Sequence, residues 1–162
     1  MKDRKGSKGV TLLELVVAVA ILGIVAAIGF PNLQTSLERN RQKEAAYELA
    51  SVLRLARAKA LELGNRTAIR LSVGGETELD ADGENEDYIL FVDSDSSSNF
   101  TAGEVVISDN RWGRGADIDA SSVSNVVVYK PSGLLLAGTN TTVTIGNYQV
   151  TVQPTTGRVI VQ

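Results

Sequence analysis

The sequence predicts an α+β protein in which a long N-terminal helix packs on an antiparallel β-sheet domain. Apolar residues recur at helical spacing up to residue 63, and they alternate with polar residues after Gly64. Residues 15–37 are uncharged on every side of the expected helix, whereas the residues that follow are apolar on one face only. The 162-residue chain therefore divides into an apolar helical segment and one domain that can bury a core.

The N-terminus is short and basic, and an apolar segment follows it. Residues 1–9 carry four Lys or Arg and one Asp, and they end in Gly9. At a rise of about 1.5 Å per residue, about 20 helical residues cross the hydrocarbon core of a bilayer. Residues 15–37, which carry no charge, are therefore long enough for a transmembrane helix.

Three interpretations of this apolar segment compete. It could be a cleaved signal peptide, a permanent signal anchor, or a helix retained after cleavage at Gly9. Glu14 disfavours a signal peptide, because a carboxylate at the centre of a membrane helix costs about 2.5–3.5 kcal/mol, and less near an end. Arg39, Arg41 and Lys43 follow the segment and leave only a small charge bias to orient an anchor.

The expected helix continues beyond the apolar segment, from about residue 11 to residue 63. Pro31 should bend or loosen it, because proline removes a backbone donor and clashes with the preceding turn. Gly64-Asn65 is typical of a helix end. One apolar stripe at spacings of three and four should cover the sheet. Its residues are Ala46, Leu49, Leu53, Ala56, Ala60 and Leu63.

Short segments with a period of two follow, separated by Gly, Asn, Pro and Ser. Gly146-Asn147 suits a two-residue hairpin turn. Residues 76–95 are rich in carboxylates and contain no Lys or Arg, so much of this stretch should be solvated loop. The expected strands are Thr67–Val73, Tyr88–Val92, Glu104–Ser108, Val126–Lys130, Leu134–Leu136, Thr141–Ile145, Tyr148–Val152 and Arg158–Val161.

Composition excludes several classes of function. The chain has no His and no Cys, which removes the commonest general base, thiol nucleophiles and most zinc sites. No nucleophile elbow or phosphate-binding loop is present in the sequence, so we expect no enzymatic activity and no cofactor. Without residues 1–9 the chain carries twelve Lys or Arg and eighteen Asp or Glu, which argues against nucleic-acid binding.

One polar loop resembles a calcium-binding loop in spacing. Asp93, Asp95, Ser97, Asn99, Thr101 and Glu104 occupy positions 1, 3, 5, 7, 9 and 12 of such a loop. Position six is Ser98, where the sharp turn needs Gly, and the flanking segments are strand-like. The pattern favours an ordinary polar loop, so no metal site is expected, with Asp93, Asp95, Asn99 and Glu104 as weak candidates.

The quoted segment "KGVTLLELVVAVAILGIVAAIGFPNL", residues 8–33, resembles the N-terminus of type IV pilins and pseudopilins. The segments "EDYILFVDSDSSSNFTAGEVVI", "YKPSGLLLAG" and "TTGRVIVQ" resemble the GspH/FimT family of minor pseudopilins and minor type IV pilins. The resemblance covers nearly the whole chain, and its N-terminal motif is the most specific part. It implies a type IV pilin fold with a transmembrane and then amphipathic helix.

The resemblance also implies processing and domain boundaries. A prepilin peptidase would cut between Gly9 and Val10 and N-methylate Val10, which leaves Glu14 as the fifth residue. The domains would then be a leader over 1–9, an assembly helix over 10–37 and a soluble domain over 38–162. Residues four apart share a helix face, so Glu14 could pair with the new amine of Val10 or with a neighbour's amine.

The function implied by the family is structural. The chain would lie in the inner membrane with its domain in the periplasm, and then join a filament through its helix. It would help to initiate or cap a pseudopilus of type II secretion or a pilus. Its partners would be other pilin subunits, prepilin peptidase and, before assembly, membrane lipid. A membrane-anchored periplasmic domain without a filament remains a third possibility.

DNA uptake by a minor pilin is the alternative function. Some relatives use a C-terminal motif of Gly-Arg, any residue and Arg, but here Gly157-Arg158-Val159 is followed by Ile160. Trp112, next to Arg111 and near Arg114, could stack on a base, although such a Trp more often packs at a loop edge.

Overall fold

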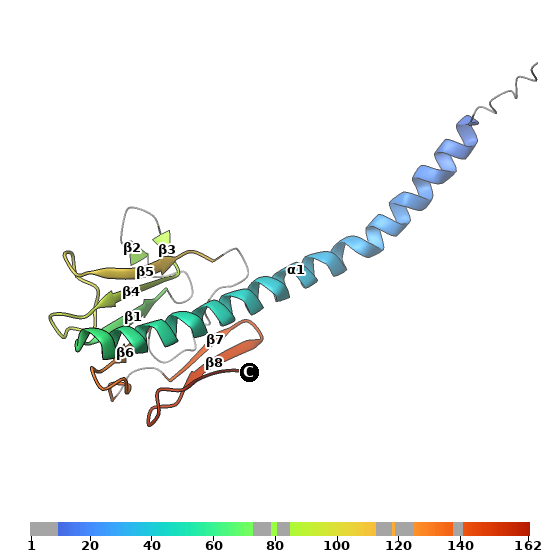
Figure 1. The fold of residues 1–162 in the computed structure, drawn as a ribbon. Helices are drawn as coiled ribbons and strands as arrows, with labels where there is room; N and C mark the ends of the chain where they lie inside the picture. The colour runs from blue at the N-terminus through green and yellow to red at the C-terminus, as the bar shows by residue number, and fades with distance from the viewer. Residues whose placement is uncertain (1–9, 73–78, 81–84, 113–117, 119–124, 138–140) are drawn as a thin grey trace, which may run out of the picture. The chain divides into compact units, whose positions relative to one another are not determined.

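The computed structural model describes residues 10–72, 79–80, 85–112, 118, 125–137 and 141–162 (Figure 1). The expected leader with Gly9 lies outside the described residues. The chain forms two compact units, Met1–Leu37 and Glu38–Gln162. Helix α1 (Leu12–Leu63) contributes residues to both units, so each unit is described by itself below.

The start of α1 is set by Thr11. Its hydroxyl Oγ1 accepts a hydrogen bond from the backbone N–H of Glu14 at 3.2 Å, and its carbonyl accepts one from Leu15 at 3.2 Å. A Thr at the N-cap position satisfies backbone donors that have no partner within the helix. The helix therefore begins one residue later than expected, and its assignment continues without interruption through position 31.

The first unit exposes its apolar side chains. Leu12 is 83 % exposed, and the other large apolar side chains that the structure describes as exposed in this unit range from 47 % to 73 %. None of the helical segments that the structure describes is long and apolar enough to cross a membrane. The large apolar residues exposed in this unit are Val10, Leu12, Leu13, Leu15, Val16, Val17, Val19, Ile21, Leu22, Ile24, Val25, Phe30, Leu33 and Leu37.

In the second unit the expected apolar stripe of α1 is buried, with one correction. Ala46, Leu49, Leu53 and the two alanines that follow in the stripe are fully buried. Leu63 is 46 % exposed, so the buried stripe ends one turn before the helix does. Gly64 has a φ of +63°, the left-handed conformation that commonly ends a helix.

The described strands form two main sheets and one small hairpin. The four-stranded antiparallel sheet has the order β5-β4-β1-β6, and β7, β8 and β9 form an antiparallel three-stranded sheet. The amphipathic half of α1 lies across the larger sheet in Figure 1. The strands are β1 (Thr67–Leu71), β2 (Leu79–Asp80), β3 (Asn85–Glu86), β4 (Tyr88–Val92), β5 (Val106–Asn110), β6 (Val126–Tyr129), β7 (Thr142–Ile145), β8 (Tyr148–Val152) and β9 (Val159–Val161).

Both faces of the larger sheet are covered. Strand residues such as Leu90 and Tyr129 belong to the same buried cluster as the α1 stripe. Alternate residues, including Ile89 and Phe91, form a second cluster on the opposite face, because successive strand side chains point to opposite faces. Phe100 packs edge-on against Phe91 there, with ring centroids 5.3 Å apart. Strand β4 is therefore buried along its whole length.

Three expected features differ from the structure. Leu134–Leu136 is not a strand, because only Leu135 forms an isolated bridge, to Tyr129. The strand expected at Glu104–Ser108 is displaced to β5, because the Glu104 side chain closes the preceding loop by accepting backbone hydrogen bonds. The acidic stretch contains the short hairpin of β2 and β3, which its composition does not predict.

The hairpin expected at Gly146-Asn147 is confirmed. Ile145 pairs with Tyr148, which leaves two residues in the turn, and Gly146 has a φ of +55°. A primed two-residue turn requires this left-handed conformation. Gly157, in the loop before β9, has a similar φ of +66°.

Gly157→Ala should lower the free energy of unfolding more than Gly146→Ala. Both glycines have a left-handed φ, which costs a non-glycine residue about 1–2 kcal/mol, so this cost is similar at the two sites. A Cβ at position 157 would lie 2.6 Å from the backbone oxygen of Gly133, whereas a Cβ at position 146 would meet the flexible end of the Gln42 side chain. Thermal unfolding of the full-length chain, followed by circular dichroism, measures both. A smaller loss for Gly157→Ala would show that the contact with the Gly133 backbone does not constrain position 157.

Candidate functional site

The N-terminal end of α1 contains the predicted processing and assembly residues. Val10 is 71 % exposed and lies two residues before the first residue of α1, so its pairing with Glu14 stays a prediction. Glu14 lies in the first turn, where the helix dipole favours a negative charge. Within the described residues, the Glu14 carboxylate forms no hydrogen bond or ion pair.

The loop between β4 and β5 brings three of the four weak calcium candidates together. One carboxylate oxygen from each of Asp93, Asp95 and Glu104 lies within 4.8 Å of the others. Asp93 is buried, and its Oδ2 lies 2.9 Å from a guanidinium nitrogen of Arg66. The side chain of Asn99 accepts a hydrogen bond from Arg70 instead. Two arginines therefore supply positive charge at this loop.

Hydrogen bonds within the loop account for the other carboxylates. Asp95 accepts a bond of 2.8 Å from the Ser97 backbone, which is the main reason that its pKa is held below the ordinary value. Glu104 accepts backbone bonds from Ser94 at 2.9 Å and Thr101 at 3.1 Å. These contacts are sufficient to order an acidic loop, so calcium binding stays a weak prediction.

A second cluster surrounds Glu48 in the amphipathic half of α1. Glu48 accepts hydrogen bonds from the Tyr88 hydroxyl at 3.2 Å, from Asn110 at 2.5 Å and from the Trp112 indole at 3.0 Å. The rings of Tyr88 and Trp112 lie 5.6 Å apart, and burial raises the pKa of the Tyr88 hydroxyl. The indole is thus held between Glu48 and Tyr88 at the edge of the core. Its neighbour Arg111 is exposed.

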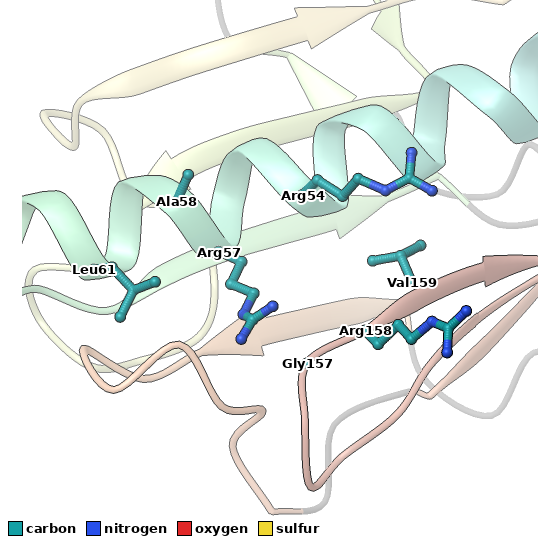
Figure 2. A pocket seen from close by; sticks show the side chains of 7 residues that line it. All are labelled: Arg54, Arg57, Ala58, Leu61, Gly157, Arg158 and Val159. Atoms are coloured by element: carbon teal, nitrogen blue, oxygen red, sulfur yellow. The ribbon is translucent and has the colours of Figure 1, made fainter.

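A third arrangement is an open pocket of about 640 Å³ between α1 and the loop before β9 (Figure 2). Its cations are Arg54 and Arg57 from the helix and Arg158 from the loop. Leu61 and Val159 supply apolar lining. Sequence patterns drew attention to Arg158 but gave no signal that two helical arginines line the same pocket, because these residues are far apart in the sequence.

Glu48→Ala should destabilise the domain by about 1–3 kcal/mol, because it leaves the Trp112 indole without its acceptor and leaves the Tyr88 hydroxyl with Ser108 alone. Glu44→Ala, an exposed carboxylate on the same helix, should change stability by less than about 0.5 kcal/mol. Thermal unfolding measures the difference. The fluorescence of Trp112, the only tryptophan in the sequence, should shift to the red in the first variant alone. Equal effects would contradict a structural role for Glu48.

Comparisons with known proteins agree with this architecture. Residues 45–161 match the family model described as type II transport protein GspH, and residues 4–30 match the prokaryotic N-terminal methylation motif. No solved structure shows a significant match.

Two similar proteins are each called fimbrial protein, and both come from Pseudomonas aeruginosa. One is 28 % identical over 109 residues, covering 67 % of this chain and 64 % of the relative. The other is 40 % identical over 58 residues, covering 36 % of this chain and 38 % of the relative. The chain therefore spans less than two thirds of the length of either relative.

The GspH family model, in contrast, matches most of the present chain. The matched residues include the buried half of α1, both main sheets and the pocket lined by Arg54, Arg57 and Arg158, here called the arginine pocket. The chain belongs to the GspH family of type IV pilin-like proteins and carries their N-terminal methylation motif.

Proposed function

We propose that this chain is a minor pilin or pseudopilin subunit that helps to initiate or cap a filament. We propose further that this filament belongs to a type II protein secretion system. The observation that carries the proposal is the apolar half of α1, which exposes Leu12, Leu13, Leu22 and similar side chains along its length. A contiguous apolar surface of this extent requires a partner surface or lipid. The methylation motif over residues 4–30 includes this segment.

Assembly through helix packing fits the composition of the segment. Leu, Ile and Val supply contact area, and Gly23 and Gly29 have open space where a side chain would stand. Small residues let helices approach closely when they pack in or near lipid. We propose that neighbouring subunits cover this surface in the filament, so that the action of the protein is structural and not enzymatic.

Processing would supply a partner for Glu14, which has none among the described residues. Cleavage between Gly9 and Val10 by a prepilin peptidase creates a cationic amine at Val10, which the same enzyme methylates. Glu14 then neutralises that amine in its own chain or in a neighbouring subunit. An opposite charge beside a carboxylate in an apolar environment removes much of the cost of burying it.

The location before assembly is proposed to be the inner membrane, with the domain in the periplasm. The support is the sequence, in which residues 15–37 carry no charge. The described helices do not by themselves meet the requirements of a membrane span. Lipid would cover the apolar side chains until other subunits replace it.

A second candidate function is nucleic-acid binding by a minor pilin during DNA uptake. The observation that favours it is the convergence of Arg54, Arg57 and Arg158 on one pocket. The engagement of Trp112 with Glu48 and Tyr88 removes the most obvious stacking platform. A comparison of the affinities of the chain for a labelled oligonucleotide and for a labelled acidic peptide tests this candidate.

The first prediction of the proposal concerns the mature N-terminus. Mass spectrometry of the chain expressed with a prepilin peptidase should find that residues 1–9 are missing and that Val10 carries one methyl group. A Gly9→Leu variant, which removes the small residue at the cleavage site, should keep its leader. If residues 1–9 persist in the unaltered chain, the pilin function is wrong.

The second prediction concerns incorporation into filaments. Glu14→Leu should be cleaved normally but should reach sheared filaments about tenfold less than the unaltered chain, because the buried amine loses its counter-charge. Glu38→Leu, which removes a carboxylate beyond the apolar segment, is the matched control and should incorporate normally. Quantitative immunoblotting of filament and membrane fractions measures the ratio. Normal incorporation of Glu14→Leu would remove the pairing role.

A further inference from the structure

The arginine pocket is built by the fold and is not a chance group of surface side chains. Arg57 is half-buried, and its Nε donates a hydrogen bond of 3.1 Å to the Gly133 carbonyl, which fixes the guanidinium plane. Gly157 makes room for it, because a Cβ there would lie 2.8 Å from the same Nε. Figure 2 shows Arg57 extending from α1 toward the Gly157 loop, with Arg54 and Arg158 on either side of Val159.

The pocket concentrates positive charge without compensation. Among the described residues, none of Arg54, Arg57 and Arg158 forms an ion pair, and no carboxylate lines the pocket. The chain as a whole carries a net charge of −3, so three grouped cations are contrary to its average composition. Like charges in one pocket repel each other, and an anion that binds between them relieves this repulsion.

The lining indicates what kind of anion fits. Guanidinium groups bind carboxylates and phosphates through paired N–H donors. Leu61, which is 54 % exposed, places apolar surface beside these donors, and Val159 is buried at the base of the lining with 7 % exposure. A carboxylate on an alkyl stem, as in Glu or Asp within a peptide, satisfies both parts of the pocket. A sugar–phosphate chain would bury its charges but would find no partner for its polar sugars at the apolar lining.

We propose that Arg54, Arg57 and Arg158 form a receptor for an acidic peptide segment of a neighbouring filament subunit. This inference rests on the proposed function, because the filament supplies the neighbour. The net negative charge favours a protein segment over nucleic acid, since DNA presents about one charge per 1.7 Å and would also meet the acidic remainder of the domain. A short peptide with a few carboxylates can engage this pocket alone.

The test measures peptide binding to the purified full-length chain in non-ionic detergent at low salt. Fluorescein-labelled hexaglutamate is the probe, and labelled hexathymidylate is the nucleic-acid comparison. Hexaglutamate should bind saturably, and Arg54→Gln/Arg158→Gln should weaken it by about tenfold or more through the loss of charge-assisted hydrogen bonds. Arg57 is left intact because its Nε also supports the Gly133 loop.

The control variant is Arg39→Gln/Lys43→Gln, which removes the same charge from exposed positions of the same helix outside the pocket. It should weaken hexaglutamate binding by less than about twofold, as expected for a general charge effect at distance. Equal weakening by both double variants, or no saturable binding, would overturn the receptor. Tighter binding of hexathymidylate, lost in the pocket variant, would assign the pocket to nucleic acid and overturn the peptide proposal.

A filament measurement tests the neighbour. Arg54→Glu/Arg158→Glu should be processed normally but should be depleted from sheared filaments relative to Arg39→Glu/Lys43→Glu. Equal incorporation would contradict a receptor for a neighbouring subunit. A different result would show that the proposed function itself is wrong. In that case residues 1–9 would persist, while peptide binding to the isolated chain would be unaffected.

Discussion

The folded unit depends on the packing of one apolar face of α1, in which many side chains are alanine, against two sheets. Ala46, Ala56 and Ala60 are fully buried, and such small side chains let the helix approach the strands closely. The same buried cluster contains Leu90 from the larger sheet and Val150 from the smaller one. The hydroxyl of Thr67 on β1 donates a 2.9 Å hydrogen bond to the Ala56 carbonyl and fixes the first strand to the helix.

This packing also positions the polar features of the domain. Residues adjacent to the stripe lie at the margins of the helix–sheet contact, where their stems are covered and their polar ends can reach loops. Glu48 thus accepts hydrogen bonds from Asn110 at the end of β5 and from Trp112, while Arg57 donates one to the Gly133 carbonyl. One helix face stabilises the core, and its borders carry the contacts on which the proposed receptor depends.

Sequence periodicity predicted most elements because their signals are local. The end of α1 at Leu63, strand β4 and the hairpin of β7 and β8 follow from helix-stop chemistry, alternation and a two-residue turn. The arginine pocket joins residues about a hundred positions apart, so local patterns could not predict it. The strand prediction for Leu134–Leu136 is wrong. These residues do not alternate between apolar and polar, and their only ladder contact among the described residues is the isolated bridge between Leu135 and Tyr129, which is not a local signal.

The helix dipole favours the charge of Glu14, but no cation pairs with this carboxylate among the residues that the structure describes. Thr11 caps the helix through its own hydroxyl, which accepts from the Glu14 backbone N–H and needs nothing from the Glu14 side chain. Within the described residues, the reciprocal bond from the Thr11 N–H to the carboxylate, which completes a capping box, is not formed. An uncharged residue would serve the cap equally well. A carboxylate in an otherwise uncharged helical surface therefore calls for a cation from outside that surface, and the terminus that we propose is created at Val10 would supply it.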